Sequence, residues 1–151
     1  FRYVDLDELL GSSDVVTLHV PANKHTVNLI AEDEFRRMKD GVVFINTARG
    51  PIVHIQALLE AIASGKVSAA GLDVLPEEPT LREEAELLHT AFRRRHNLET
   101  LLADHILLRM RNVLVTPHTA FNTREAVRRI LETTEENITA FARGEATNVV
   151  T

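Results

Sequence analysis

The sequence predicts an α/β fold in which about four parallel strands form part of a sheet and helices flank them. Short, Val-rich apolar runs recur along the chain, and each has the length and composition of a buried strand. Stretches with helical periodicity separate most of these runs, which indicates right-handed βαβ crossovers. Polar side chains follow several of the runs at the strand ends where parallel sheets bind ligands.

The first part of the chain alternates between helix and strand. Residues 5–10 predict a short helix, and residues 14–20 predict a buried strand. Residues 31–41 predict a second helix with Gly41 as its C-terminal stop. Residues 41–48 predict the next strand. This order is typical of a parallel sheet with crossover helices.

The same alternation continues further along the chain. Residues 51–65 predict one helix, because Pro51 suits a first turn and Gly65 suits a terminator. Residues 68–75 and 112–116 predict two more strands. Four strands make a modest sheet with an unprotected edge.

Two helical segments complete the prediction. Residues 80–110 interrupt the alternation and predict a helical insertion, which is too long for a simple connection. Residues 123–143 predict a long C-terminal helix, with a capping box formed by Asn122 and Glu125 and with Gly144 as its stop.

Composition narrows the class of protein. The hydrophobic fraction of 44% and the charged fraction of 26% are typical of a globular domain. The net charge of −5 argues against a nucleic-acid or membrane partner. The absence of Cys excludes disulfides and thiolate chemistry.

Without a long apolar run or a signal-peptide pattern, we expect a cytoplasmic protein. The chain begins with Phe1, so we expect it to be processed or to be a fragment.

Three charged positions lie at or after the ends of predicted strands. Arg49, in the segment TARG, precedes a helix, where a guanidinium suits an anionic ligand; the alternative is an ordinary surface arginine. Asp73 ends an apolar strand, where it could accept a hydrogen bond from a cofactor amide or cap a neighbouring loop. Glu78, or its neighbour Glu77, lies between two prolines and could orient a histidine or be merely solvated.

His118 is the candidate proton carrier. It follows Pro117 at a predicted strand end, and an imidazole there can pass a proton to a carbonyl oxygen. His19 lies within a predicted strand, so we expect it to pack in the core. The spacing of the other histidines indicates no metal site; these are His25, His54, His89, His96 and His105. Arginine, carboxylate and histidine at strand ends are the groups that reduction of a 2-keto acid needs.

With these motifs in place, the chain resembles the D-isomer-specific 2-hydroxyacid dehydrogenases. The matching segments are 12–30, 38–53, 57–79 and 112–127. The long segment between Glu78 and His118 and the ending PHTAF look most like the D-lactate dehydrogenase branch. The resemblance implies a Rossmann-like sheet and reversible hydride transfer between NADH and a small 2-keto acid such as pyruvate.

The resemblance also implies roles for single residues. Arg49 would hold the substrate carboxylate, and His118 would donate the proton in reduction and accept it in oxidation. Glu78 would pair with His118 and favour its protonated form; its position five residues after Asp73 fits the family pattern better than Glu77 does. Phe121 would touch the substrate side chain.

NAD is the implied cofactor. Val20 and Pro21 would line the adenine-side cleft, with Thr26 nearby. The backbone of Thr47 and Ala48 would face the nicotinamide. Asp73 would bind the carboxamide, and Ala120 would lie beside the ring. The full set of implied cofactor contacts is Val20, Pro21, Thr26, Thr47, Ala48, Arg49, Asp73, His118 and Ala120.

The chain departs from the family pattern in one respect. It has no GxGxxG motif, which the family carries upstream of the point that matches Phe1. We therefore expect residues 1–121 to be the C-terminal portion of the cofactor domain, and residues 122–151 to be a helix and tail that return to a substrate domain. The chain alone would be largely inactive. The 2-keto acid and the choice between NAD and NADP stay open, and the intact enzyme is expected to be a homodimer.

Two other functions stay open from the sequence. A non-catalytic NAD-sensing interaction module, such as a corepressor, would retain the same three side chains. A split or decaying gene product would self-associate through its bare sheet edge and last helix.

Overall fold

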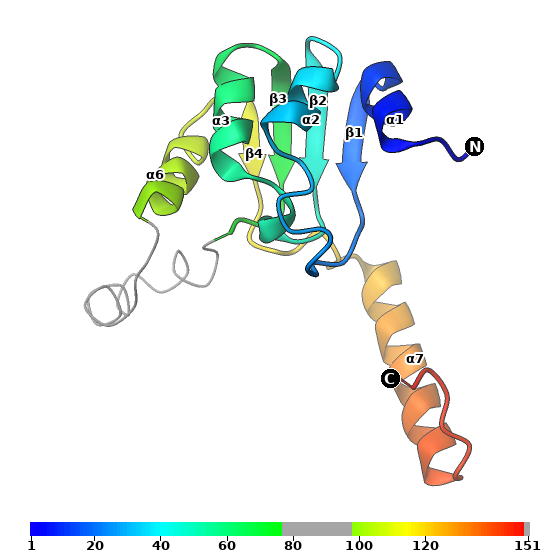
Figure 1. The fold of residues 1–151 in the computed structure, drawn as a ribbon. Coiled ribbons are helices and arrows are strands. Elements are labelled where there is room, and N and C mark those ends of the chain that lie inside the picture. Colours follow the sequence, from blue (N-terminus) through cyan, green and yellow to red (C-terminus); the bar gives the residue numbers. More distant parts are fainter. Residues whose placement is uncertain (77–97, 150–151) are drawn as a thin grey trace. The chain divides into compact units, whose positions relative to one another are not determined.

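The computed structural model describes residues 1–76 and 98–149. The chain divides into two compact units, Phe1–His118 and Thr119–Thr151 (Figure 1). The elements, in chain order, are α1 (Leu6–Ser12), β1 (Val15–Leu18), α2 (Glu32–Arg37), β2 (Val42–Asn46), the 3₁₀ helix η1 (Gly50–Ile52), α3 (Ile55–Ala63), β3 (Val67–Leu72), α6 (Leu98–Leu107), β4 (Val113–Val115) and α7 (Arg124–Ala142).

The first unit is built on a four-stranded parallel sheet in the order β1-β2-β3-β4. Each of the four predicted strand segments overlaps one of these strands, so the predicted α/β class is confirmed. Because all strands are parallel, their carboxyl ends meet at one edge of the sheet. That edge carries the loops that follow β1, β2, β3 and β4.

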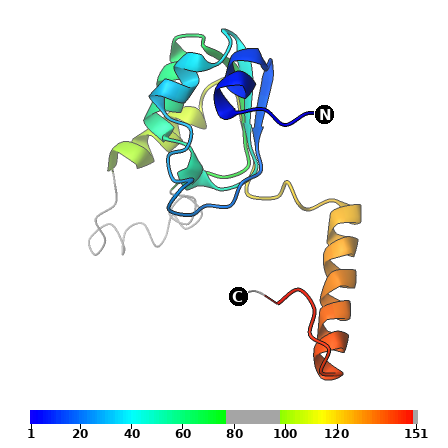
Figure 2. The same cartoon turned by 45° about the vertical axis from the view of Figure 1, so that its right-hand side comes forward.

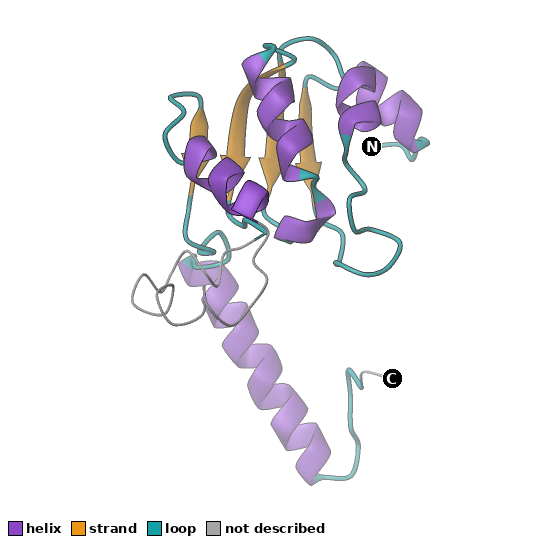
Figure 3. Cartoon of the chain, turned by 60° about the vertical axis from the view of Figure 1, so that its left-hand side comes forward, coloured by secondary structure: helices purple, strands orange, loops and turns teal. Residues whose placement is uncertain are grey.

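Helices α1, α2, α3 and α6 form a layer on one face of the sheet (Figures 2 and 3). The centre of the core is Phe44 of β2, whose side chain is 0% exposed. Its ring meets the ring of Phe35 of α2 edge to face, with centroids 5.3 Å apart. This packing fixes β2, the strand that leads to Arg49.

The helix predicted over residues 31–41 is shorter than expected. It ends at Arg37, because Met38 is already extended, with ψ of 162°, while its N–H still donates to the Glu34 carbonyl. Gly41 does adopt a positive φ of 79°, but it makes the turn into β2 and does not end the helix. The predicted role of Gly41 as a helix stop is therefore wrong.

The single helix predicted over residues 51–65 is also wrong, because η1 and α3 share this part of the chain and are separated by Val53 and His54. Val53 is extended and forms an isolated parallel bridge with Ile30. Three main-chain hydrogen bonds make a ladder between residues 28–30 and 51–54. These bonds run from Asn28 N to Pro51 O (2.9 Å), from Ile30 N to Ile52 O (3.1 Å) and from His54 N to Ile30 O (2.9 Å).

The predicted insertion, residues 80–110, lies partly outside the described residues, which resume at residue 98. Its final part contains α6, which packs on α3. Ala103 and Leu107 of α6 are buried in the core of the first unit.

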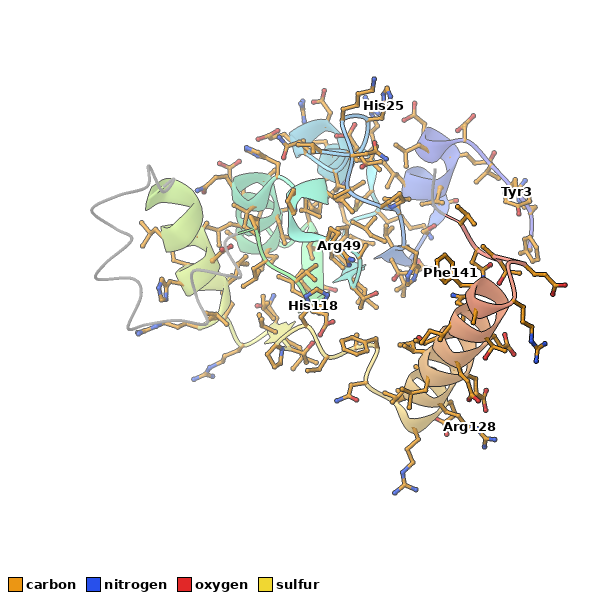
Figure 4. All side chains as sticks on the ribbon, turned by 90° about the horizontal axis from the view of Figure 1, so that it is seen from below. Tyr3, His25, Arg49, His118, Arg128 and Phe141 are labelled. Carbon is orange, nitrogen blue, oxygen red and sulfur yellow. The ribbon has the colours of Figure 1, made fainter. Side chains whose placement is uncertain are left out.

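The second unit contains α7. Its N-cap is Thr123, whose hydroxyl accepts a hydrogen bond from Ala126 N (3.2 Å), so the predicted cap at Asn122 is wrong by one residue. Gly144, with φ of 77°, follows the end of the helix as predicted. Several apolar side chains of α7 are exposed, namely Ile130, Leu131, Ile138 and Phe141. Phe141 is labelled in Figure 4. The predicted functional division between residues 121 and 122 stays a prediction.

Within the described ranges, no helix has the length and apolarity that a bilayer span requires.

Candidate functional site

An open groove of about 600 Å³ lies where the loops leave the carboxyl ends of β1 and β2. It brings together five of the predicted cofactor residues and adds two others. The residues that line it are His19, Val20, Pro21, Ala22, Thr47, Ala48 and Arg49. This is the position in which open parallel sheets bind ligands.

The loop after β1 forms one wall of the groove. Thr26 shapes this loop and is not among the residues that line the groove: its hydroxyl donates to Pro21 O (2.6 Å) and accepts from Asn23 N (2.8 Å). The side chain predicted to lie near the cofactor thus holds the turn that places Pro21.

His19 is not the core histidine that the sequence predicted. Strand β1 ends at Leu18, one residue earlier, so the imidazole is exposed and lines the groove. Its Nε2 lies 3.1 Å from the hydroxyl oxygen of Thr17. The error arises from a strand boundary that was placed two residues too late.

The loop after β2 forms the other wall, and a buried side chain organises it. Asn46 is 1% exposed. Its Oδ1 accepts from Ala48 N (3.0 Å), and its Nδ2 donates to Arg49 O (3.1 Å). Arg49 is extended and exposed, and its Nη1 donates to Ala48 O (2.6 Å). Asn46 is not among the residues predicted from the sequence, although an Asn that ends an apolar strand before a loop is a known signal for such a turn.

Gly50 allows a close approach between this loop and the chain after β3. A Cβ at position 50 would lie 2.5 Å from the Leu75 carbonyl oxygen and 2.6 Å from the Pro76 nitrogen. Only a residue without a side chain therefore fits at the first position of η1, directly after Arg49.

Asp73 joins the ends of three strands. It is 3% exposed, and its N–H donates to Asn46 O (2.9 Å). Its carbonyl accepts from His118 N (3.0 Å), and its carboxylate Oδ1 accepts a hydrogen bond from the Thr116 hydroxyl. Asp73 does not line the groove itself.

His118 adopts a left-handed backbone conformation, with φ of 55°. Its N–H points to two carbonyl oxygens, those of Asp73 and Thr116, each at 3.0 Å. A non-glycine residue in this region is uncommon and is found preferentially at functional positions. Arg49 and His118 both belong to loops at the carboxyl ends of the strands (Figure 4).

The hydrogen bond from the Thr116 hydroxyl to the Asp73 carboxylate can be tested by mutation. We expect Thr116→Val to lower the free energy of unfolding by about 1–3 kcal/mol, because a buried carboxylate loses a donor without a change in side-chain shape. Urea denaturation measures the loss, and Thr116→Ser should restore most of it. Thr17→Val is the control, since Thr17 is exposed, and we expect a change within about 0.5 kcal/mol. Equal losses in both Val variants would contradict the assignment.

Four predicted residues are not placed in this site. Glu78 and its alternative Glu77 lie outside the described residues. Ala120 and Phe121 belong to the second unit. Among the residues that are described, no group of three or more His, Asp or Glu side chains is arranged to hold a metal ion.

Comparison with known proteins identifies the family. A family model described as the NAD-binding domain of D-isomer-specific 2-hydroxyacid dehydrogenases matches residues 1–120. The D-specific alpha-keto acid dehydrogenase of Enterococcus faecium is 42% identical over 142 residues, which cover 94% of this chain and 42% of the relative. The hydroxypyruvate reductase of Blautia hydrogenotrophica is 36% identical over 99% of this chain and 40% of the relative.

A similar solved structure agrees with these relatives. The D-lactate dehydrogenase from Aquifex aeolicus, complexed with NAD and lactic acid, superposes with a TM-score of 0.76 at 40% identity, over 95% of this chain and 41% of that one. The chain spans less than half the length of these relatives. It belongs to the D-isomer-specific 2-hydroxyacid dehydrogenase family, and residues 1–120 match that family's NAD-binding domain.

Proposed function

We propose that this chain supplies the nicotinamide and substrate side of an enzyme that interconverts a small 2-keto acid, such as pyruvate, and its D-2-hydroxy acid. The observation that carries the proposal is the groove at the carboxyl ends of β1 and β2, which gathers Val20, Pro21, Thr47, Ala48 and Arg49. Members of the family are NAD-dependent oxidoreductases of 2-hydroxy acids.

The lining of the groove fits a nicotinamide nucleotide. Val20 and Pro21 offer apolar surface to the adenine side of the nucleotide, and the backbone of Thr47 and Ala48 faces the nicotinamide. Arg49 adds a guanidinium for the substrate carboxylate. The buried carboxylate of Asp73 is an acceptor suited to a carboxamide N–H. NADH, when bound, supplies the hydride.

Each catalytic side chain has a proposed task. Arg49 binds the substrate carboxylate through its planar guanidinium and so orients the carbonyl group. His118 donates a proton to the carbonyl oxygen during reduction and removes it from the hydroxyl during oxidation. Glu78 holds His118 in its protonated form, Ala120 lies beside the ring, and Phe121 contacts the substrate side chain.

The wider assembly is also a proposal. Relatives more than twice as long as this chain carry the activities named above. We expect the 151 residues alone to show little turnover with NADH and pyruvate, because orientation and exclusion of water require a closed cleft. The intact enzyme is proposed to be a cytoplasmic homodimer. Ordinary turnover by the purified chain would contradict the expectation of low activity.

Titration of the purified chain with NADH, followed by nucleotide fluorescence, tests the proposal. We expect saturable binding that weakens at least about tenfold in Arg49→Ala and in Asp73→Ala, since each change removes a polar contact worth about 1.5–3 kcal/mol. Arg128→Ala on α7 is the matched control, because Arg128 is an exposed arginine in the other unit. The proposal fails if Arg49→Ala and Arg128→Ala bind NADH equally well, or if the folded chain does not bind NADH at millimolar concentration.

A further inference from the structure

We propose that Asn46 is a positioning residue for Arg49: one buried amide fixes the main chain on both sides of this arginine. The inference rests on the role proposed for Arg49 and extends the site to a residue that contacts neither substrate nor cofactor. Asn46 Oδ1 holds the Ala48 N–H at 3.0 Å, and Asn46 Nδ2 holds the Arg49 carbonyl at 3.1 Å. The two bonds close a ring of hydrogen bonds around the residue that carries the guanidinium.

The surroundings of Asn46 indicate that packing does not explain its presence. It lies at the end of β2, in register with Leu18 of β1 and Leu72 of β3, and both neighbours are buried and apolar. A leucine would continue this row. Burial of an amide is unfavourable unless both its donor and its acceptor are satisfied, and here the Arg49 loop satisfies both.

The ring of hydrogen bonds bears on how the guanidinium can recognise a ligand. An arginine side chain has many rotamers, and fixing its direction costs conformational entropy. Asn46 holds the Thr47–Ala48 and Arg49–Gly50 peptide groups, which bracket Ala48 and Arg49. The side chain therefore starts from a fixed Cα direction, and Nη1 then reaches Ala48 O at 2.6 Å. The substrate carboxylate binds through two parallel N–H groups. Because the Arg49 guanidinium is already oriented, it loses less conformational entropy when the carboxylate binds.

A double-mutant cycle separates positioning from general structure. The NADH dissociation constant is measured for the unmodified chain, Asn46→Leu, Arg49→Lys and the double variant. Leucine has the same number of side-chain heavy atoms as asparagine and the same branch at Cγ, suits the apolar row and adds no charge. We expect Asn46→Leu to weaken NADH binding about tenfold beside Arg49, and less than threefold in the Arg49→Lys background. Equal weakening in both backgrounds would show that Asn46 acts only through the fold.

The control variant is Asn112→Leu. Asn112 Nδ2 donates to Ser68 O (2.9 Å), the same type of bond, just before β4 and at the opposite end of that strand from His118. We expect its NADH affinity to equal that of the unmodified chain. A tenfold weakening in Asn112→Leu would overturn the inference, because loss of any such amide would then have the same effect.

A second measurement needs no nucleotide and so separates this inference from the proposed function. Phenylglyoxal modifies accessible arginines, and mass spectrometry gives the rate at each one. We expect Arg49 to react at least about threefold faster in Asn46→Leu, because its guanidinium leaves Ala48 O, while exposed Arg128 keeps its rate. An unchanged Arg49 rate overturns the positioning role whether or not the chain binds NADH. A faster rate without NADH binding would support positioning and contradict the proposed function.

Discussion

A Gly50→Ala variant is expected to lose about 3 kcal/mol of its free energy of unfolding, a large share of the stability of an ordinary domain. The new methyl group would lie 2.5 Å from the Leu75 carbonyl oxygen and 2.6 Å from the Pro76 nitrogen, and both are backbone atoms that cannot rotate away. The loops after β2 and β3 must therefore separate. Urea denaturation followed by circular dichroism measures the loss.

The same substitution elsewhere provides the control. A Cβ at Gly11 in α1 would have the Arg37 carbonyl oxygen as its nearest neighbour, at 3.8 Å, an ordinary contact. We expect Gly11→Ala to stabilise the chain by about 0.5–1 kcal/mol, because alanine favours the helical backbone. If Gly50→Ala matched Gly11→Ala, the close approach beside Arg49 would not exist in solution.

Phe44→Ala is expected to cost about 3–5 kcal/mol, the range for removing an aromatic side chain from a core. Phe44 is fully buried at the centre of β2, and its ring packs edge to face on Phe35. The cavity would lie beneath the strand that leads to Asn46 and Arg49. Differential scanning calorimetry should show a thermal midpoint many degrees lower, since ~1 kcal/mol shifts the midpoint by several degrees in a domain of this size.

Leu114→Ala is the matched control for this core substitution. Leu114 lies on β4, and its side chain is 67% exposed, so its removal should change stability by less than about 0.5 kcal/mol. A loss of several kcal/mol there would mean that a surface exposed in the first unit is covered in solution.

The strands could be predicted because their signal is local. Val42, Val43, Phe44 and Ile45 form a continuous apolar run, and such a run between helical segments admits few interpretations. The break at Val53 could not be predicted in this way. It depends on pairing with Ile30, more than twenty residues away, and this contact leaves no trace in the periodicity of residues 51–65.

In the candidate site, too, some features could be predicted from the sequence and others could not. Arg49, Asp73 and His118 could be predicted as candidates from the sequence, because polar residues at the ends of apolar strands are unusual. The hydrogen bonds that connect them could not be found. Thr116 resembles any strand threonine until the structure shows its hydroxyl on Asp73, and the two bonds of Asn46 require the loop to be already folded.

The ladder between residues 28–30 and 51–54 has a consequence for how this site can diversify. Its bonds join main-chain groups only, and it fastens the segment after one wall of the groove to the segment after the other. The separation of the walls thus depends little on which side chains line them. Residues such as Val20, Ala22 and Ala48 can be exchanged during evolution, or by a designer, to change the chemistry of the lining while its width is kept.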